Sequence, residues 1–171
     1  MTLQKYHPLL RVIHWIMMVA ISSILVLGFV MVEYKDCEPW NLYEWHKSLG
    51  ILVFSLVWLR LFIRWISITP PLPKTISAVN RLMAHIVAYL LYICMIVMPI
   101  SGYAVSNMNG FAVKFFTYPL PTIFAKNLEL AQLAEQVHTY TAYALLILLA
   151  LHILGVILHH FQGEEILRRM T

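Results

Sequence analysis

The sequence predicts an all-α membrane protein, a bundle of four transmembrane helices whose two termini both face the cytoplasm. Three observations lead to this prediction, namely the composition, four long apolar stretches and the distribution of lysine and arginine. Of the 171 residues, 61% are hydrophobic and 12% are charged, and the mean hydropathy is +0.76. This composition lies far outside the range of soluble globular domains.

Four apolar stretches are long enough to cross a membrane, since a helix needs roughly 20 apolar residues to span a hydrocarbon core of about 30 Å. We expect spans at about residues 12–32, 46–66, 82–105 and 137–160. The first stretch is too long for the apolar region of a secretory signal, and no small-residue cleavage pattern follows it. Because the four spans use more than half of the chain and leave no room for a second globular domain, we expect residues 1–171 to form one domain.

Lysine and arginine are unevenly distributed between the two sides of the predicted bundle. Eight lie on the side of the termini and four on the opposite side, whereas six of the eight acidic residues lie on that opposite side. The resulting net charges are +6 and −2. Cytoplasmic loops carry the excess of basic residues in membrane proteins, so we expect a multi-pass protein with cytoplasmic termini. The formal net charge of +4 indicates contact with anionic lipid rather than with nucleic acid.

Histidines inside the predicted spans are the candidate functional residues, because ionisable side chains are rare and costly in a membrane. His138 and His152 lie fourteen residues apart on the fourth span. At 100° per residue they face within about 40° of each other, and ~21 Å of helix axis separates them. One helix therefore offers an imidazole near each membrane surface.

Two further histidines lie at matching depths on other spans. His14 is near the cytoplasmic end of the first span, level with His152, and His46 is near the outer end of the second span, level with His138. Two imidazoles on opposite sides of a porphyrin saturate its iron, which suits electron transfer. The chain lacks a Cys-x-x-Cys-His motif, so we predict two non-covalent haems b. Histidines that hydrogen-bond between helices, or a transition-metal channel, are the alternative interpretations.

Three other residues lie at the depths of these histidines. Gly28, fourteen residues after His14, would let a porphyrin approach the helix backbone at the outer site. Gly50, one turn after His46, has either the same role or an ordinary role in helix packing. Arg60, fourteen residues after His46, could pair with haem propionates, or its side chain could extend to the cytoplasmic interface.

Five segments of the sequence together resemble the bacterial cytochrome b561 family. They are Arg-Val-Ile-His-Trp at 11–15, Trp-His-Lys-Ser-Leu-Gly at 45–50, Thr-Pro-Pro-Leu-Pro at 69–73, Met-Pro-Ile-Ser-Gly at 98–102, and the stretch at 151–160 that begins Leu-His and ends His-His. Their order and spacing match the family over nearly the whole chain.

This resemblance implies a four-helix bundle in the bacterial cytoplasmic (inner) membrane. It implies that His14 and His152 bind the iron of the inner haem, and that His46 and His138 bind the iron of the outer haem. It also implies electron exchange with ubiquinone, as a substrate or a bound acceptor. One branch of the family is a superoxide oxidase, which passes electrons from superoxide to quinone.

The family also has a quinone pocket between the loop after the two prolines and the end of the fourth span. The matching residues are Lys74 and His159, a cation and an imidazole that suit quinone carbonyls and proton uptake. Lys74 could instead anchor the loop in anionic lipid, and His159 could be a polar residue at the interface. His85, early in the third span, is a candidate haem or quinone contact, with an interhelical hydrogen bond as the alternative.

The outer side has a net charge of −2, whereas oxidation of an anion such as superoxide favours a positive entrance. Lys47, Lys114 and Lys126 could still form a local positive patch. The aromatic-rich loop at 106–136 is expected either to cover the outer haem or to anchor the chain at the interface.

Three functional classes remain open at this point. The first is a di-haem electron carrier between ubiquinone and an unidentified one-electron partner at the outer face. The second is a superoxide:ubiquinone oxidoreductase, and the third is a haem-bearing membrane anchor of a larger dehydrogenase or hydrogenase. The anchor-subunit class is disfavoured because little of the chain lies outside the bilayer to bind a partner subunit. Whether the protein is an enzyme in its own right depends on this choice.

Overall fold

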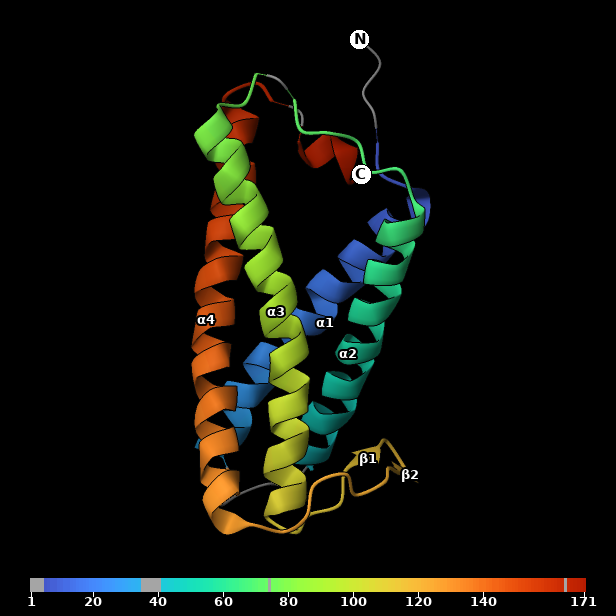
Figure 1. Ribbon diagram of the computed structural model, residues 1–171, viewed down its shortest axis with the longest axis vertical. Coiled ribbons are helices and arrows are strands. Elements are labelled where there is room, and N and C mark those ends of the chain that lie inside the picture. The colour runs from blue at the N-terminus through green and yellow to red at the C-terminus, as the bar shows by residue number, and fades with distance from the viewer. Residues whose placement is uncertain (1–4, 35–40, 74, 165) are drawn as a thin grey trace.

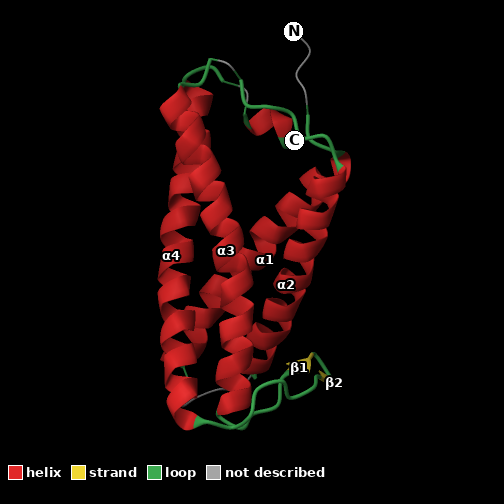
Figure 2. Cartoon of the chain, viewed as in Figure 1, coloured by secondary structure: helices red, strands yellow, loops and turns green. Residues whose placement is uncertain are grey.

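The computed structural model describes residues 5–34, 41–73, 75–164 and 166–171. Four long helices dominate the structure (Figures 1 and 2), namely α1 (Pro8–Glu33), α2 (Leu42–Ile66), α3 (Ala78–Met108) and α4 (Leu128–Phe161). A short antiparallel hairpin of β1 (Lys114–Phe115) and β2 (Tyr118–Pro119) lies between α3 and α4, and the 3-10 helix η1 (Leu167–Arg169) follows α4. All four long helices have the length and hydropathy needed to cross a membrane.

The helices run alternately in opposite directions, so the first and last described residues lie at the same end of the bundle (Figure 1). We call this end the termini end. The β1–β2 hairpin lies at the other end, which we call the hairpin end. Each of the four predicted spans lies within one helix.

Local capping explains where α3 and α4 begin. The Ser77 side chain accepts a hydrogen bond from the Asn80 backbone N–H at the start of α3. At the start of α4, the Asn127 side chain accepts from the backbone N–H groups of Glu129 and Leu130. The prediction of a loop over 106–136 was wrong at both ends, because α3 continues to Met108 and α4 begins at Leu128. The first turns of α4 are polar, so hydropathy alone did not show that the helix begins at Leu128.

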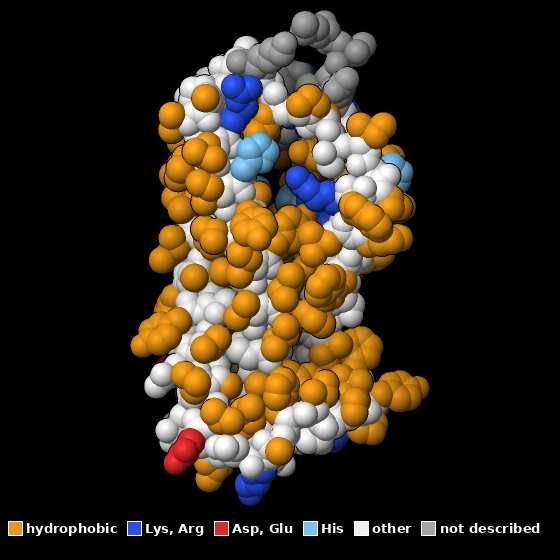
Figure 3. Space-filling model, in the orientation of Figure 1, with side chains coloured by type: hydrophobic (Ala, Val, Ile, Leu, Met, Phe, Trp, Pro, Cys, Tyr) orange, Lys and Arg blue, Asp and Glu red, His pale blue; other side chains and the backbone are white. Residues whose placement is uncertain are grey.

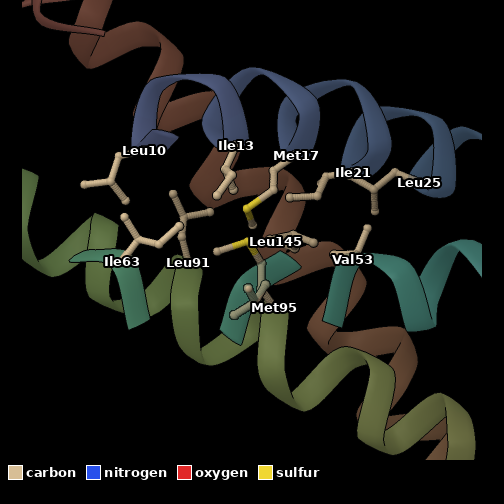
Figure 4. Close-up of a cluster of buried hydrophobic side chains, with 11 residues drawn as sticks. Leu10, Ile13, Met17, Ile21, Leu25, Val53, Ile63, Leu91, Met95 and Leu145 are labelled. Atoms are coloured by element: carbon tan, nitrogen blue, oxygen red, sulfur yellow. The ribbon is translucent and has the colours of Figure 1, made fainter. Parts of the chain in front are cut away.

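The bundle consists of two helix pairs, with α1 along α2 and α3 along α4 (Figure 1). One face of α1 supplies much of the buried core, with apolar side chains three or four residues apart that meet residues of the other three helices (Figure 4). The α1 members are Leu10, Ile13, Met17, Ile21 and Leu25. Most other large apolar side chains point outward and cover the surface (Figure 3), as expected for helices that contact lipid.

Candidate functional site

The four histidines of the predicted spans form two close pairs, and each pair joins α4 to a different helix. At the termini end, the ring centroids of His14 on α1 and His152 on α4 lie 6.2 Å apart, with the ring planes inclined by 68°. At the hairpin end, the ring centroids of His46 on α2 and His138 on α4 lie 6.1 Å apart, with an inclination of 71°. All four side chains are partly buried. The structure therefore brings together the residues that were paired by depth in the sequence.

The spacing of both pairs fits two imidazoles bound to opposite sides of one metal ion. A metal–nitrogen bond of ~2.0 Å plus roughly 1 Å from each nitrogen to its ring centre gives centroids about 6 Å apart. Among the described residues, no three His, Cys, Asp or Glu side chains converge as potential metal ligands. A haem fits, because its porphyrin supplies the other four ligands itself.

His138 is held in place by α3. Its Nδ1 lies 2.9 Å from the Met98 carbonyl oxygen and 3.2 Å from the Ser101 hydroxyl. Because the carbonyl can only accept, Nδ1 carries the hydrogen, and Nε2 keeps the lone pair that binds metals. A Cβ atom on Gly102 would lie 2.9 Å from Cε1 of His138, so only glycine leaves room for the ring. In the sequence, Ser101 and Gly102 belong to a segment that resembles the family, but nothing there indicated that they contact a histidine.

His46 lies in a similar position against α1. Its Nδ1 is buried beside the carbonyl of Ile24, and a Cβ atom on Gly28 would lie 3.1 Å from its Cε1. As around His138, the carbonyl precedes the glycine by one helical turn, but Nδ1 of His46 forms no hydrogen bond of standard geometry. The space beside Gly28 thus accommodates an imidazole. Gly50 has only an ordinary contact, with Ile24 Cδ1 3.5 Å from its Cβ position, which favours a role in helix packing.

Arg60 is buried near the histidine pair of the termini end, with 8% of its surface exposed. Its Nη1 donates a hydrogen bond of 2.8 Å to the carbonyl of Leu10, which lies one turn before His14 on α1. Its Nε donates a bond of 3.0 Å to the hydroxyl of Tyr92 on α3. The side chain therefore does not extend to the interface, and α1 and α3 hold two of its donor atoms.

The prokaryotic cytochrome b561 family matches residues 5–171 of the chain. The protein belongs to this family. One relative of this b561 cytochrome is the cytochrome b561 homolog 2 of Escherichia coli K12, which is 29% identical over 99% of this chain and 92% of that protein. Another is the probable superoxide oxidase CybB of Yersinia pestis, which is 30% identical over 98% of this chain and 96% of that protein. Membership identifies a multi-pass membrane cytochrome and implies a b-type haem.

At the termini end of α4 in this b561 cytochrome, the imidazole of His159 lies against the carboxylate of Glu164. Nδ1 of the imidazole lies 2.7 Å from Oε2 of the carboxylate, and the two side chains are only 13% and 12% exposed. Gly163, with a φ of 78°, lets the chain turn back after α4. His159 was predicted from the sequence, but Glu164 was not, because its only signal was its position five residues later. Lys74, the other predicted quinone residue, lies outside the described residues.

His85 lies on the exposed side of α3 and lines a cavity of about 520 Å³ between α2 and α3 at the termini end. Arg64 and Tyr89 line the same cavity. A hollow with basic and histidine side chains at its edge is visible on this face of the molecule (Figure 3). Tyr92, which accepts from Arg60, also lines the cavity. The cavity therefore leads from the lipid-facing surface toward the surroundings of the buried arginine.

The loop between α3 and α4 covers the hairpin end of α2. Ser48, two residues after His46, is buried and donates to the carbonyl of Lys114 at 3.4 Å. The same hydroxyl accepts a 2.8 Å hydrogen bond from the backbone N–H of Phe116. The ring of Phe116 also contacts Trp45 edge-on, with centroids 5.5 Å apart. These contacts favour the covering role over that of a plain interfacial anchor.

Asn107, at the end of α3, organises this loop, and nothing in the sequence had pointed to it. It is buried, and its Oδ1 accepts from the backbone N–H groups of Ile123 at 2.9 Å and Phe124 at 3.4 Å. Its Nδ2 donates to the carbonyl of Phe111 at 3.4 Å. One buried amide thus ties together both branches of the loop.

The three lysines that could form an outer positive patch have different surroundings. The Nζ atom of Lys47 lies 3.3 Å from a carboxylate oxygen of Glu44, so its charge is largely compensated. Lys126 packs against Gly110, since the Cδ and Cε atoms of the lysine lie 3.6 Å from the place where a Cβ on Gly110 would be. Lys114 has an exposed side chain on the hairpin.

Residues 166–171 pack across the termini end, where they contact α1 and the loop between α2 and α3. The buried Arg169 donates from Nη2 to the carbonyls of Pro70 at 2.8 Å and Pro71 at 2.7 Å in the loop between α2 and α3. The indole N–H of Trp15, next to the α1 histidine, donates to the carbonyl of Met170 at 2.9 Å. From the sequence, Arg169 was predicted only to contribute a cytoplasmic charge.

Proposed function

We propose that this cytochrome binds two haems b and transfers electrons between ubiquinone at the termini end and a one-electron partner at the hairpin end. The proposal is carried by the two cross-helix imidazole pairs, whose centroids lie 6.2 and 6.1 Å apart. His14 and His152 would bind one iron, and His46 and His138 the other. When bound, the haems supply the one-electron chemistry that amino-acid side chains lack. The protein contributes ligands, orientation and burial.

The ligand arrangement favours electron transfer over oxygen chemistry. Each iron would have imidazole on both sides and no open position for a small molecule. The hydrogen bond from His138 to the Met98 carbonyl fixes one ligand in the tautomer that binds metal through Nε2. The fourteen residues between His138 and His152 correspond to ~21 Å of helix rise, so the two sites together reach across most of a membrane.

Pyridine haemochrome analysis of the purified protein tests the stoichiometry, and we expect two haems b per chain. His46→Ala and His138→Ala should each remove one spectral component, whereas His14→Ala and His152→Ala should each remove the other. His160→Ala, which changes an exposed histidine on α4, is the matched control and should keep both. A single haem per chain, or loss of the same component in the His46 and His152 variants, would refute the assignment.

For the quinone site we propose the surroundings of His159 and Lys74. The pairing of His159 with Glu164 at 2.7 Å supports this, because an imidazole held by a carboxylate can give a proton to a quinone carbonyl and recover it. His159→Ala and Lys74→Ala should leave both haem spectra intact but slow re-oxidation of the reduced protein by a soluble ubiquinone analogue. His160→Ala should re-oxidise at the wild-type rate. Wild-type rates in both test variants would place the pocket elsewhere.

We propose that the termini end faces the cytoplasm in the bacterial inner membrane. Among the described residues, seven basic side chains belong to this end and three to the hairpin end, and cytoplasmic loops are enriched in basic residues. Single cysteines introduced near the C-terminus and in the β1–β2 hairpin, in a background without native cysteines, test this in intact cells. A membrane-impermeant thiol reagent should label only the hairpin position, and labelling at the C-terminus would reverse the orientation.

Superoxide oxidation is a second candidate function, favoured by the similarity to the probable superoxide oxidase CybB. Two superoxide anions would each lose one electron and leave as dioxygen, and one ubiquinone would take both electrons and two protons. The pairing of Lys47 with Glu44 weakens the positive entrance that would attract the anion. Rapid mixing of the oxidised protein with superoxide should reduce the haems within the lifetime of superoxide. If the haems are reduced equally well when superoxide dismutase is present from the start of mixing, superoxide is excluded as the donor.

A further inference from the structure

We propose that the cavity between α2 and α3 at the termini end binds one anionic phospholipid, with its phosphate at Arg64 and His85 and its acyl chain against apolar side chains. Lipid binding at this site does not depend on the proposed electron transfer. The cavity has a volume of about 520 Å³. Pockets of roughly 300–1,000 Å³ hold drug-sized ligands, so a phosphate group and the first part of an acyl chain fit inside. The remainder of the lipid would lie in the surrounding bilayer.

The cavity opens sideways, toward the lipid that surrounds the bundle. Its described lining residues all belong to α2 or α3, whereas the histidine pair at this end joins α1 to α4. Ile86 and Leu90 line the cavity and are also exposed on the surface, by 41% and 39%. The opening is part of the hollow visible in Figure 3. A lipid can therefore enter from the bilayer without displacing either histidine of the pair.

The polar end of the cavity lacks a counter-charge. Arg64, in the last turn of α2, has a half-buried side chain. Within the part of the chain that the structure describes, neither Arg64 nor His85 forms a hydrogen bond or an ion pair, and no acidic side chain lines the cavity. A cation inside a membrane protein usually pairs with another group, because burial without a partner is costly. An anion in the cavity would supply that partner.

The two side chains match the chemistry of a phosphate group. A guanidinium donates two parallel hydrogen bonds to phosphate oxygens, and the N–H of an imidazole can add a third. Arg81 lies one turn before His85 on the same side of α3 and adds a second positive charge close to the polar end of the cavity. A neutral quinone offers no charge to these groups. The charge of the site therefore favours an anionic headgroup.

The order of polar and apolar residues along both helices matches that of a phospholipid. α2 ends and α3 begins at the termini end (Figure 1). Arg64 follows Leu61 by three residues, or ~4.5 Å of helix rise, and so lies closer to this end. His85 precedes Leu90 by five residues, or ~7.5 Å, and also lies closer to it. A lipid with its phosphate at this end and its acyl chain toward the middle of the bundle meets suitable side chains along its length.

Native mass spectrometry of the haem-loaded protein tests the choice of headgroup. The protein is offered phosphatidylglycerol or phosphatidylcholine with the same acyl chains. We expect one phosphatidylglycerol to remain bound under conditions that remove phosphatidylcholine. Arg64→Gln should weaken phosphatidylglycerol binding by roughly tenfold, because hydrogen bonds to a charged group are lost. Arg168→Gln, which removes an exposed charge at the same end of the molecule, should bind the lipid as before.

Filling the cavity tests its shape without changing any charge. Ala88 lines the cavity, so Ala88→Leu would place a larger side chain in the space for the acyl chain. We expect this variant to bind phosphatidylglycerol several times more weakly, whereas Ala150→Leu, on the exposed surface of α4, should bind it as before. A phosphatidylglycerol with a photoreactive group in its acyl chain should label peptides that contain Ile86 or Leu90.

Several results would overturn the inference. Equal retention of both lipids by the unaltered protein, or unchanged binding in Arg64→Gln, would show that the cavity does not select an anionic headgroup. Loss of one haem spectral component in Arg64→Gln, with lipid binding unchanged, would show that the guanidinium serves the haem instead. Displacement of the lipid by a soluble ubiquinone analogue would identify a quinone site. Displacement by inorganic phosphate at the same concentration would show that the acyl chain contributes nothing to binding.

Discussion

Replacement of Gly102 by alanine tests how tightly the structure holds His138. The added Cβ would lie 2.9 Å from Cε1 and 3.1 Å from Nδ1 of the imidazole. Favourable contacts between carbon atoms begin at about 3.5 Å, so the ring must move by roughly half an ångström. The same Nδ1 donates to the Met98 carbonyl on the same helix. The ring therefore cannot retreat without weakening this hydrogen bond.

Two contributions determine the size of the effect. A weakened hydrogen bond costs about 1 kcal/mol, and forcing a methyl group into an occupied space costs roughly 1–3 kcal/mol. Because a displaced ring is no longer in place to bind iron, we expect this cost to appear in haem binding. A total of about 2–4 kcal/mol corresponds to a loss of roughly 30-fold to 1,000-fold in haem affinity at the hairpin end.

Haem titration of the haem-depleted protein, followed by reduced-minus-oxidised spectra, measures this loss for each site separately. The termini-end component should be unaffected in Gly102→Ala. Two matched controls exist, because a Cβ on Gly155 meets no atom within 4 Å and one on Gly50 meets Ile24 Cδ1 at an ordinary 3.5 Å. Both alanine variants should bind two haems with the original affinity. If Gly102→Ala also did so, the steric argument would be refuted.

Three other substitutions test contacts that the structure revealed. Arg169→Gln should lower the free energy of unfolding by about 2–3 kcal/mol, because two buried carbonyls lose a charged donor; an unchanged unfolding temperature in detergent would contradict this. Asn107→Ala should make the loop between α3 and α4 several times more sensitive to limited proteolysis, whereas Asn109→Ala, which loses only a bond to its own helix, should not. Glu164→Gln should slow re-oxidation by a ubiquinone analogue without changing the haem spectra, and equal rates would show that the carboxylate is not needed.

The sequence was sufficient to predict the four helices and the two histidine pairs. Helix geometry is regular, so a spacing of fourteen residues fixes both the face and the depth of His138 and His152. Alternating helix direction then fixes which histidines on other spans lie at the same depth. The family match supports the kind of cofactor that the paired histidines suggested.

The contacts around the histidines could not be predicted from the sequence in the same way. The support of His138 by Met98 and Gly102 depends on the rotation of α3 about its own axis, which a smooth hydropathy profile does not define. The roles of Asn107 and Arg169 depend on the path of loops, whose geometry follows from particular backbone angles and side-chain partners. In each case the residue type was visible, but a partner lay far away in the sequence, up to 17 residues for Asn107, 40 for His138 and 99 for Arg169.

The division into two helix pairs suggests a structural role for the haems. Each histidine pair joins α4 to α1 or α2, the helices of the other pair, and the buried residues of α4 among the described ones are Ala131 and Leu145. In lipid, apolar side chains gain little by moving from hydrocarbon to protein, so packing and polar contacts must hold the pairs together. A ligand bound only to the native state, at 1,000 times its dissociation constant, adds about 4 kcal/mol of stability. We therefore expect the haem-free protein to unfold at a lower temperature than the loaded protein, with the single-haem variants His14→Ala and His46→Ala between them. An unfolding temperature that did not depend on haem would show that side-chain packing alone holds the two pairs together.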